Sequence, residues 1–146
     1  MIRKLIYLLI LALLVFVPVK KLDVAKLEPV EVVSVQCRDG GILLQTDTEA
    51  WGFGADAAAA LEDMQKRTPG VIYLDTAEFL LVSEAALHQI QALRPWLKER
   101  VKLCQAEAAD LKTAAHLLEI HDDLPRLRDW IDGQILPQIQ DGKFIE

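Results

Sequence analysis

The chain has 146 residues, of which 52% are hydrophobic, and its formal net charge is −6. This length suits one domain with a modest core. All 22 acidic residues but only 12 of the 16 basic residues follow Lys21, so the chain beyond Lys21 carries a net charge of −10. A surface this acidic is repelled by phosphate backbones, so composition predicts no nucleic-acid partner.

Residues 5–19 contain no charged side chain, and basic pairs flank them on both sides. As a helix this run is about 22 Å long, shorter than the ~30 Å core of a bilayer. Long basic side chains can reach the headgroups from such a helix. We therefore predict one N-terminal transmembrane helix, an anchor over residues 1–21 that contacts lipid through Leu5, Ile6, Leu8, Leu9, Ile10, Leu11, Leu13, Leu14, Val15, Phe16 and Val17.

Two alternatives to this anchor are a cleaved signal peptide and a buried helix. A signal peptide needs small residues at a cleavage site, and Val15 to Val19 supply none. A helix that is apolar on all sides and flanked by charge is untypical of a globular surface. The basic flanks are nearly balanced, but the short tail before the anchor favours an internal N-terminus. We expect a single-pass protein of the cell membrane with its domain outside the cytoplasm.

The first half of the remaining chain alternates β-branched stretches with glycine-containing turns. Asp39, Gly40 and Gly41 provide the turn of a hairpin. Asp56 is placed to cap a helix whose apolar residues recur at helical spacing. The predicted order is a linker over 22–29, strands over 30–37 and 42–46, a loop over 48–54 and a helix over 55–66.

The second half repeats the alternation of strands and helices. Ser83 and Asp110 are expected to cap helices, and Pro125 to begin a last short helix through Leu127, Trp130 and Ile131. The other predicted elements are strands over 71–74 and 79–82 (or one bent strand), a helix over 84–93, a strand over 101–105, a helix over 110–120 and a loosely held tail over 137–146. We predict one α/β (α+β) domain over 30–136, with a small mixed sheet and helices mainly on one face.

Few residues suggest chemistry. Cys37 and Cys104 are expected either to pair or to be buried within strands. The three histidines lack metal-ligand spacing, and no catalytic motif or glycine-rich cofactor loop is present, so we expect no enzyme, metal or cofactor. A small envelope hydrolase using Cys104 or a histidine is the rival hypothesis. Trp51 and Phe53 either fold back on the core or contact a protein partner.

Several stretches resemble the N-terminal domain of the Ger(x)C spore germination proteins, the C subunits of germinant receptors. The resemblance covers roughly residues 22–120 and lies in Gly54 to Leu61, Ile72 to Leu74, Phe79 to Glu84, Val101 to Ala106 and Asp110 to Leu118. Unlike that family, this chain has no lipoprotein cysteine near residues 17–22. The resemblance implies an extracytoplasmic, membrane-tethered, non-enzymatic domain. We expect it to bind envelope proteins, as an assembly module or, if cleaved, as a secreted domain.

Overall fold

The computed structural model of the chain describes residues 4–7, 12, 24–107, 111–121, 123–141 and 143–145. Residues 4–7 are helical, and most of the predicted anchor over 1–21 lies outside the described residues. Within the described part of the chain, no helix has both the length and the apolar composition that crossing a membrane requires. The N-terminal transmembrane helix is thus not supported by the structure and stays a prediction.

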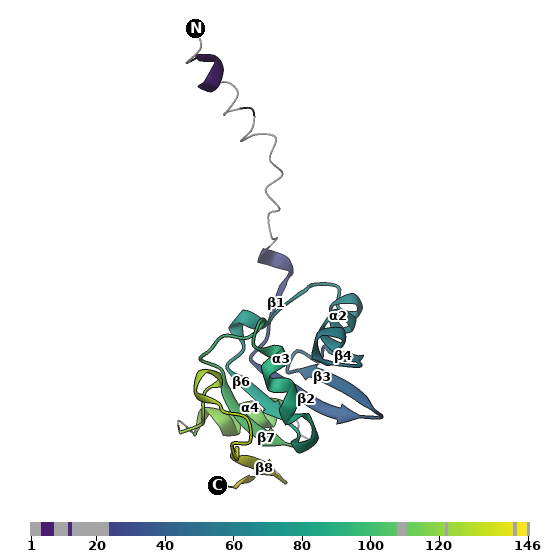
Figure 1. Ribbon diagram of the computed structural model, residues 1–146, viewed down its shortest axis with the longest axis vertical. Coiled ribbons are helices and arrows are strands. Elements are labelled where there is room, and N and C mark those ends of the chain that lie inside the picture. Colours follow the sequence, from purple (N-terminus) through teal and green to yellow (C-terminus); the bar gives the residue numbers. More distant parts are fainter. Residues whose placement is uncertain are drawn as a thin grey trace.

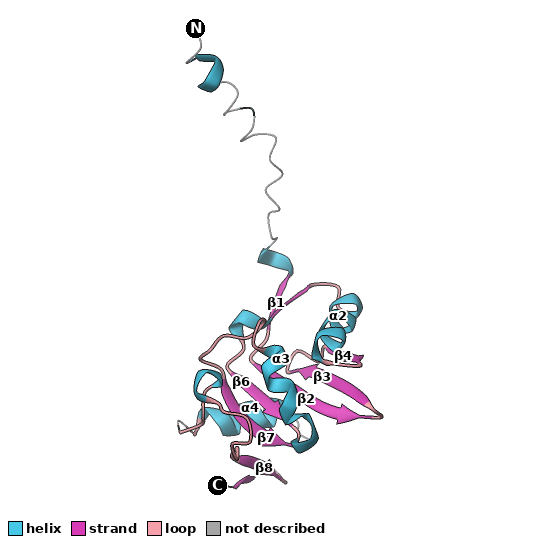
Figure 2. Ribbon diagram, viewed as in Figure 1, coloured by secondary structure: helices cyan, strands magenta, loops and turns pink. Residues whose placement is uncertain are grey.

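A mixed seven-stranded sheet, in the order β4-β3-β2-β6-β7-β8-β9, forms the centre of the described domain (Figures 1 and 2). Strands β2, β6, β7 and β8 are parallel to their neighbours in that series, whereas β3, β4 and β9 join by antiparallel pairs. The strands are β2 (Val32–Arg38), β3 (Gly41–Thr46), β4 (Trp51–Gly54), β6 (Phe79–Val82), β7 (Lys102–Ala106), β8 (Gln138–Gln140) and β9 (Lys143–Ile145). The predicted mixed α/β class is confirmed.

The β2–β3 hairpin forms where the glycine turn predicted it. Asp39 and Gly40 both have positive φ, at 49° and 79°, and Arg38 pairs directly with Gly41. A two-residue turn with positive φ at both positions matches the twist of antiparallel strands. Local sequence therefore determines the register of this hairpin.

Helices cover both faces of the sheet. On one face, α2 (Ala57–Arg67), the 3-10 helix η3 (Glu84–Gln89) and α3 (Ile90–Leu93) pack on the side that includes Val35 and Leu80. On the other face, α4 (Leu111–Glu119) packs on the side that includes Leu81. Helices do lie mainly on one face, as predicted, but α4 gives the opposite face a second core.

A separate pair of parallel strands precedes and flanks this sheet. Strand β1 (Leu27–Pro29), which follows the 3-10 turn η1 (Val24–Lys26), pairs with β5 (Val71–Tyr73). The 3-10 turn η2 (Leu74–Thr76) then separates β5 from β6, so the two stretches are not one bent strand. The Thr76 hydroxyl accepts from Val30 N at 2.9 Å, which ties η2 to the start of the domain. The segment predicted as a linker thus contributes a strand.

Two other predicted elements differ from the structure because long-range hydrogen bonds replace local ones. Ser83 Oγ accepts from Cys37 N at 3.3 Å instead of capping a helix, and the next turns are 3-10. Pro125 O accepts from Leu103 N at 2.8 Å, so that segment follows β7 and only the 3-10 turn η4 (Leu127–Asp129) forms. Leu127 and Trp130 are buried, as expected, but Ile131 is exposed.

The segment after residue 136, expected as a loose tail, extends the sheet. Gln105 N donates to Pro137 O at 2.8 Å, and β8 then pairs in parallel with β7 before β9 returns. Figure 1 places this hairpin at the end of the domain opposite to β1. The two ends of the described domain are therefore distinct surfaces.

Candidate functional site

Trp51 and Phe53 lie on the edge strand β4, which corrects the loop predicted over residues 48–54. Side chains alternate along a strand, so Gly52 and Gly54 face α2 while Trp51 and Phe53 point to the other side of the sheet. Leu43 is directly opposite Phe53. Because the intervening residues are glycines, sequence patterning gave no alternation of hydrophobic and polar residues by which to recognise this strand.

The two glycines allow α2 to pack directly on the backbone of β4. A Cβ atom on Gly52 would lie closer than 3.0 Å to Ala60 O and Met64 N, and one on Gly54 would lie 2.5 Å from Ala60 N. These neighbours are helix backbone, which cannot turn aside as a side chain can. The close approach therefore requires glycine at both positions.

Two charged residues of α2 hold the aromatic side of β4 in place. Asp63 Oδ2 accepts from Phe53 N at 2.9 Å and from Arg67 Nε at 2.8 Å. Arg67 Cζ lies 4.1 Å from the centroid of the Trp51 ring, a cation–π contact. Hydrogen bonding from Arg67, and then from Phe53 N–H, holds the pKa of Asp63 below its usual value. Since Asp63 occupies the Phe53 N–H, this edge is partly closed to a pairing strand.

The side chains of Trp51 and Phe53 remain well exposed, at 45% and 41%. On their side of the sheet, α4 belongs to a core with Leu81 and Cys104 on the central strands, and β4 is outside that core. We call the exposed surface formed by Trp51 and Phe53 the β4 face. The first hypothesis for these aromatic residues, burial in the core, therefore does not describe them.

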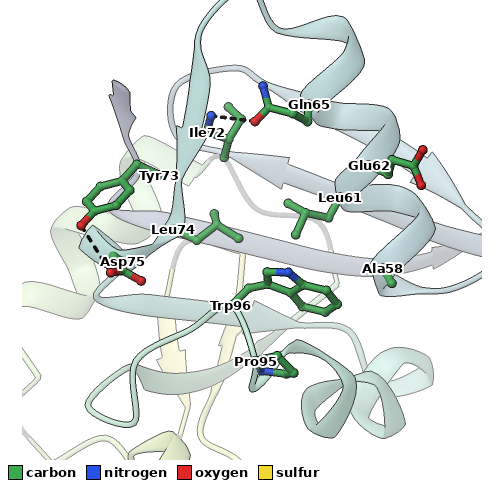
Figure 3. Close-up of a pocket in the computed structure, with 10 residues that line it drawn as sticks. All are labelled: Ala58, Leu61, Glu62, Gln65, Ile72, Tyr73, Leu74, Asp75, Pro95 and Trp96. Carbon is green, nitrogen blue, oxygen red and sulfur yellow. Dashed lines mark hydrogen bonds between the residues drawn. The ribbon is translucent and has the colours of Figure 1, made fainter. Parts of the chain in front are cut away.

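A cleft with a volume of about 640 Å³ opens on the other side of α2. It lies between α2 and the β5–η2 segment, and Figure 3 shows Leu61 and Leu74 facing each other across it with Trp96 at its base. Glu62 lines it from α2 and Asp75 from η2. Apolar walls with a few polar groups, at this volume, are typical of ligand sites.

The carboxamide of Gln65 satisfies the edge of β5 beside this cleft. Gln65 Oε1 accepts from Ile72 N at 3.0 Å, and Gln65 Nε2 donates to Gly70 O at 2.7 Å (Figure 3 shows the first bond). A carboxamide has the same donor and acceptor as a peptide group. Gln65 therefore takes the place that a peptide group of a neighbouring strand would take.

The two cysteines occupy different environments and are both free. Both lie on strands, as predicted, but only Cys104 is buried, and Cys37 is exposed. Burial raises the pKa of Cys104 to about 12, which disfavours the nucleophilic thiolate that a hydrolase would need. Among the described residues, no group of three or more His, Cys, Asp or Glu side chains is arranged to hold a metal ion.

Of the predicted anchor residues, Leu5 and Ile6 belong to the described helical residues and are exposed. The remaining nine lie outside the described residues. The cleft was not predicted, because its walls come from α2, β5–η2 and the segment at Trp96, which only tertiary packing brings together.

Comparison with known proteins adds no assignment: no family model, curated protein or solved structure matches this chain. The resemblance to germinant receptor C subunits therefore stays a prediction.

Proposed function

We propose that this protein is a membrane-anchored, extracytoplasmic module that binds another protein of a cell-envelope complex. The observation that carries the proposal is the β4 face, which presents Trp51 and Phe53 from a strand fixed by the Asp63–Arg67 pair. Aromatic residues are enriched among those that dominate binding energy at protein interfaces. Rings held in place before binding lose less conformational freedom when a partner arrives.

The apolar N-terminal stretch supports the membrane part of this proposal. Its length and basic flanks suit a signal-anchor, and the acidic domain would be repelled by anionic lipid headgroups. Such a domain stands away from the bilayer and offers its surface to neighbouring proteins. The resemblance to spore germination proteins suggests, as a narrower form of the proposal, a role in sporulation or germination.

The test is affinity purification of the full-length chain from membranes in mild detergent, followed by identification of co-purifying proteins. Replacing both aromatic residues, Trp51→Ala with Phe53→Ala, is expected to remove a partner while the free energy of unfolding changes by no more than about 1 kcal/mol. The matched control is Ile131→Ala with Ile135→Ala, since both isoleucines are exposed. An unchanged set of partners in the aromatic variant, or equal loss in the control, would contradict the proposal.

A further inference from the structure

The cleft beside α2 has features that are independent of the β4 face. Leu61, Leu74 and Trp96 form its apolar surface, and Glu62 and Asp75 are the charged side chains that line it. None of the described lining residues is cationic. Both carboxylates belong to the part of the chain that carries the net charge of −10. Charge and apolar surface together favour an occupant that is both apolar and cationic.

Lysines already neighbour both carboxylates, but neither lysine lines the cleft. Lys66 Nζ lies 2.7 Å from Glu62 Oε1, and Lys98 Nζ lies 3.9 Å from Asp75 Oδ2. Exposed ion pairs of this kind contribute little free energy, so a ligand cation can share or replace these lysines at small cost. From the cleft side, the Tyr73 hydroxyl also donates to Asp75 Oδ2 at 3.3 Å (Figure 3). A cation bound in the cleft would therefore share both carboxylates with these donors.

The edge of β5 indicates that the occupant of the cleft has an extended backbone. Gln65 occupies Ile72 N and Gly70 O, so an occupant of the cleft lies beside this carboxamide and reaches β5 through other backbone groups. In a strand the N–H and C=O of one residue point to the same side, so the Ile72 carbonyl also points away from β1. The cleft between β5–η2 and α2 thus combines strand backbone, apolar side chains and carboxylates (Figure 3).

We propose that this cleft binds an extended peptide segment of a partner protein, with apolar side chains against Leu61, Leu74 and Trp96 and cationic side chains toward Glu62 and Asp75. Alternation along an extended chain puts its cationic and apolar residues on opposite sides. Addition of a peptide beside a strand edge is a recurring mode of recognition.

The probe is the synthetic peptide acetyl-Leu-Arg-Val-Lys-Leu-amide, added to the isotope-labelled full-length chain in detergent micelles. NMR is expected to show shifts of the Ile72 and Leu74 amides and of the Trp96 indole. The variant Glu62→Gln with Asp75→Asn should bind about fivefold more weakly, as loss of two exposed charge contacts implies. The control Asp39→Asn with Asp132→Asn changes net charge equally at exposed positions and should bind as the wild type does.

Trp96→Ala should also weaken binding, through loss of apolar contact. The Trp51→Ala, Phe53→Ala variant should bind the probe normally, so failure of this proposal is distinguishable from failure of the β4-face proposal. Several results would overturn the peptide site. They are equal binding of the acidic peptide acetyl-Leu-Glu-Val-Glu-Leu-amide, equal binding of n-butylamine, equal weakening in the control, or no shift at the cleft at about 5 mM probe, the weak end of specific binding.

Discussion

The substitution Gly52→Ala tests whether α2 rests directly on the backbone of β4. The new methyl group would lie closer than 3.0 Å to Ala60 O and Met64 N, so strand and helix must separate. Overpacking of this kind costs about 1–3 kcal/mol, and the upper value applies because both neighbours are backbone atoms. Alanine also reduces the freedom of the unfolded chain, which returns about 0.7 kcal/mol. The expected net loss of stability is about 2 kcal/mol.

The assay is thermal unfolding of the full-length chain in detergent, monitored by circular dichroism. A loss of about 2 kcal/mol corresponds to a fall in Tm of roughly 6–10 °C for a domain of this size. The control is Gly40→Ala, because Gly40 has a φ of +79° but no atom within 4 Å of an added Cβ. Alanine strains the backbone at this positive φ, and the reduced freedom of the unfolded chain offsets part of that strain. The net loss of stability should be about 0.5–1 kcal/mol. If Gly52→Ala lowers Tm no more than Gly40→Ala does, α2 is not seated on β4 as described.

Three further predictions concern titratable groups. In the folded chain, a thiol reagent at pH 8 should label Cys37 rapidly, and Cys104 only after unfolding, because burial raises the pKa of Cys104 to about 12; rapid labelling of both would disprove its burial. Burial and the neighbouring carboxylate of Glu119 raise the pKa of Glu31, so its ionised form opposes folding above that pKa. Glu31→Gln should therefore raise Tm at pH 7, with a gain that shrinks as pH falls through the raised folded-state pKa and is absent below the ordinary glutamate pKa of 4.5; a gain that stays constant with pH would contradict this cause. The pKa of Asp63 is lowered, so its contribution to folding stability is present above pH 3.8 and is lost as pH falls through the folded-state pKa. Asp63→Asn should therefore lower Tm at neutral pH but not in acid, and a Tm deficit that persists in acid would refute this.

Local physical rules accounted for the elements whose hydrogen bonds close within a few residues. The turn at Asp39 and Gly40 was predictable because only positive φ closes it. The start of α2 was predictable because Asp56 Oδ1 accepts from Ala59 N at 2.8 Å. In both places the residues that interact are close neighbours in the sequence.

Elements that depend on distant partners were missed. Ser83 resembles a helix cap, but its hydroxyl accepts from Cys37 N, 46 residues away. Strand β8 is polar and short, and it is ordered by pairing with β7. The aromatic residues Trp51 and Phe53 were identified as contact candidates from residue type alone, but their exposure depends on where α4 lies. The cleft required the positions of three separate segments, which no local pattern provides.

The central claim, a domain held outside the cytoplasm by an N-terminal anchor, is most directly tested with the native thiols. Cys37 is exposed and Cys104 is buried, so a membrane-impermeant maleimide added to intact cells reports the side on which Cys37 lies. If the N-terminal stretch is an anchor with the domain outside, the chain sediments with membranes and Cys37 is labelled before lysis. Labelling that occurs only after lysis, or recovery of the full-length chain in the soluble cytosolic fraction, would contradict it.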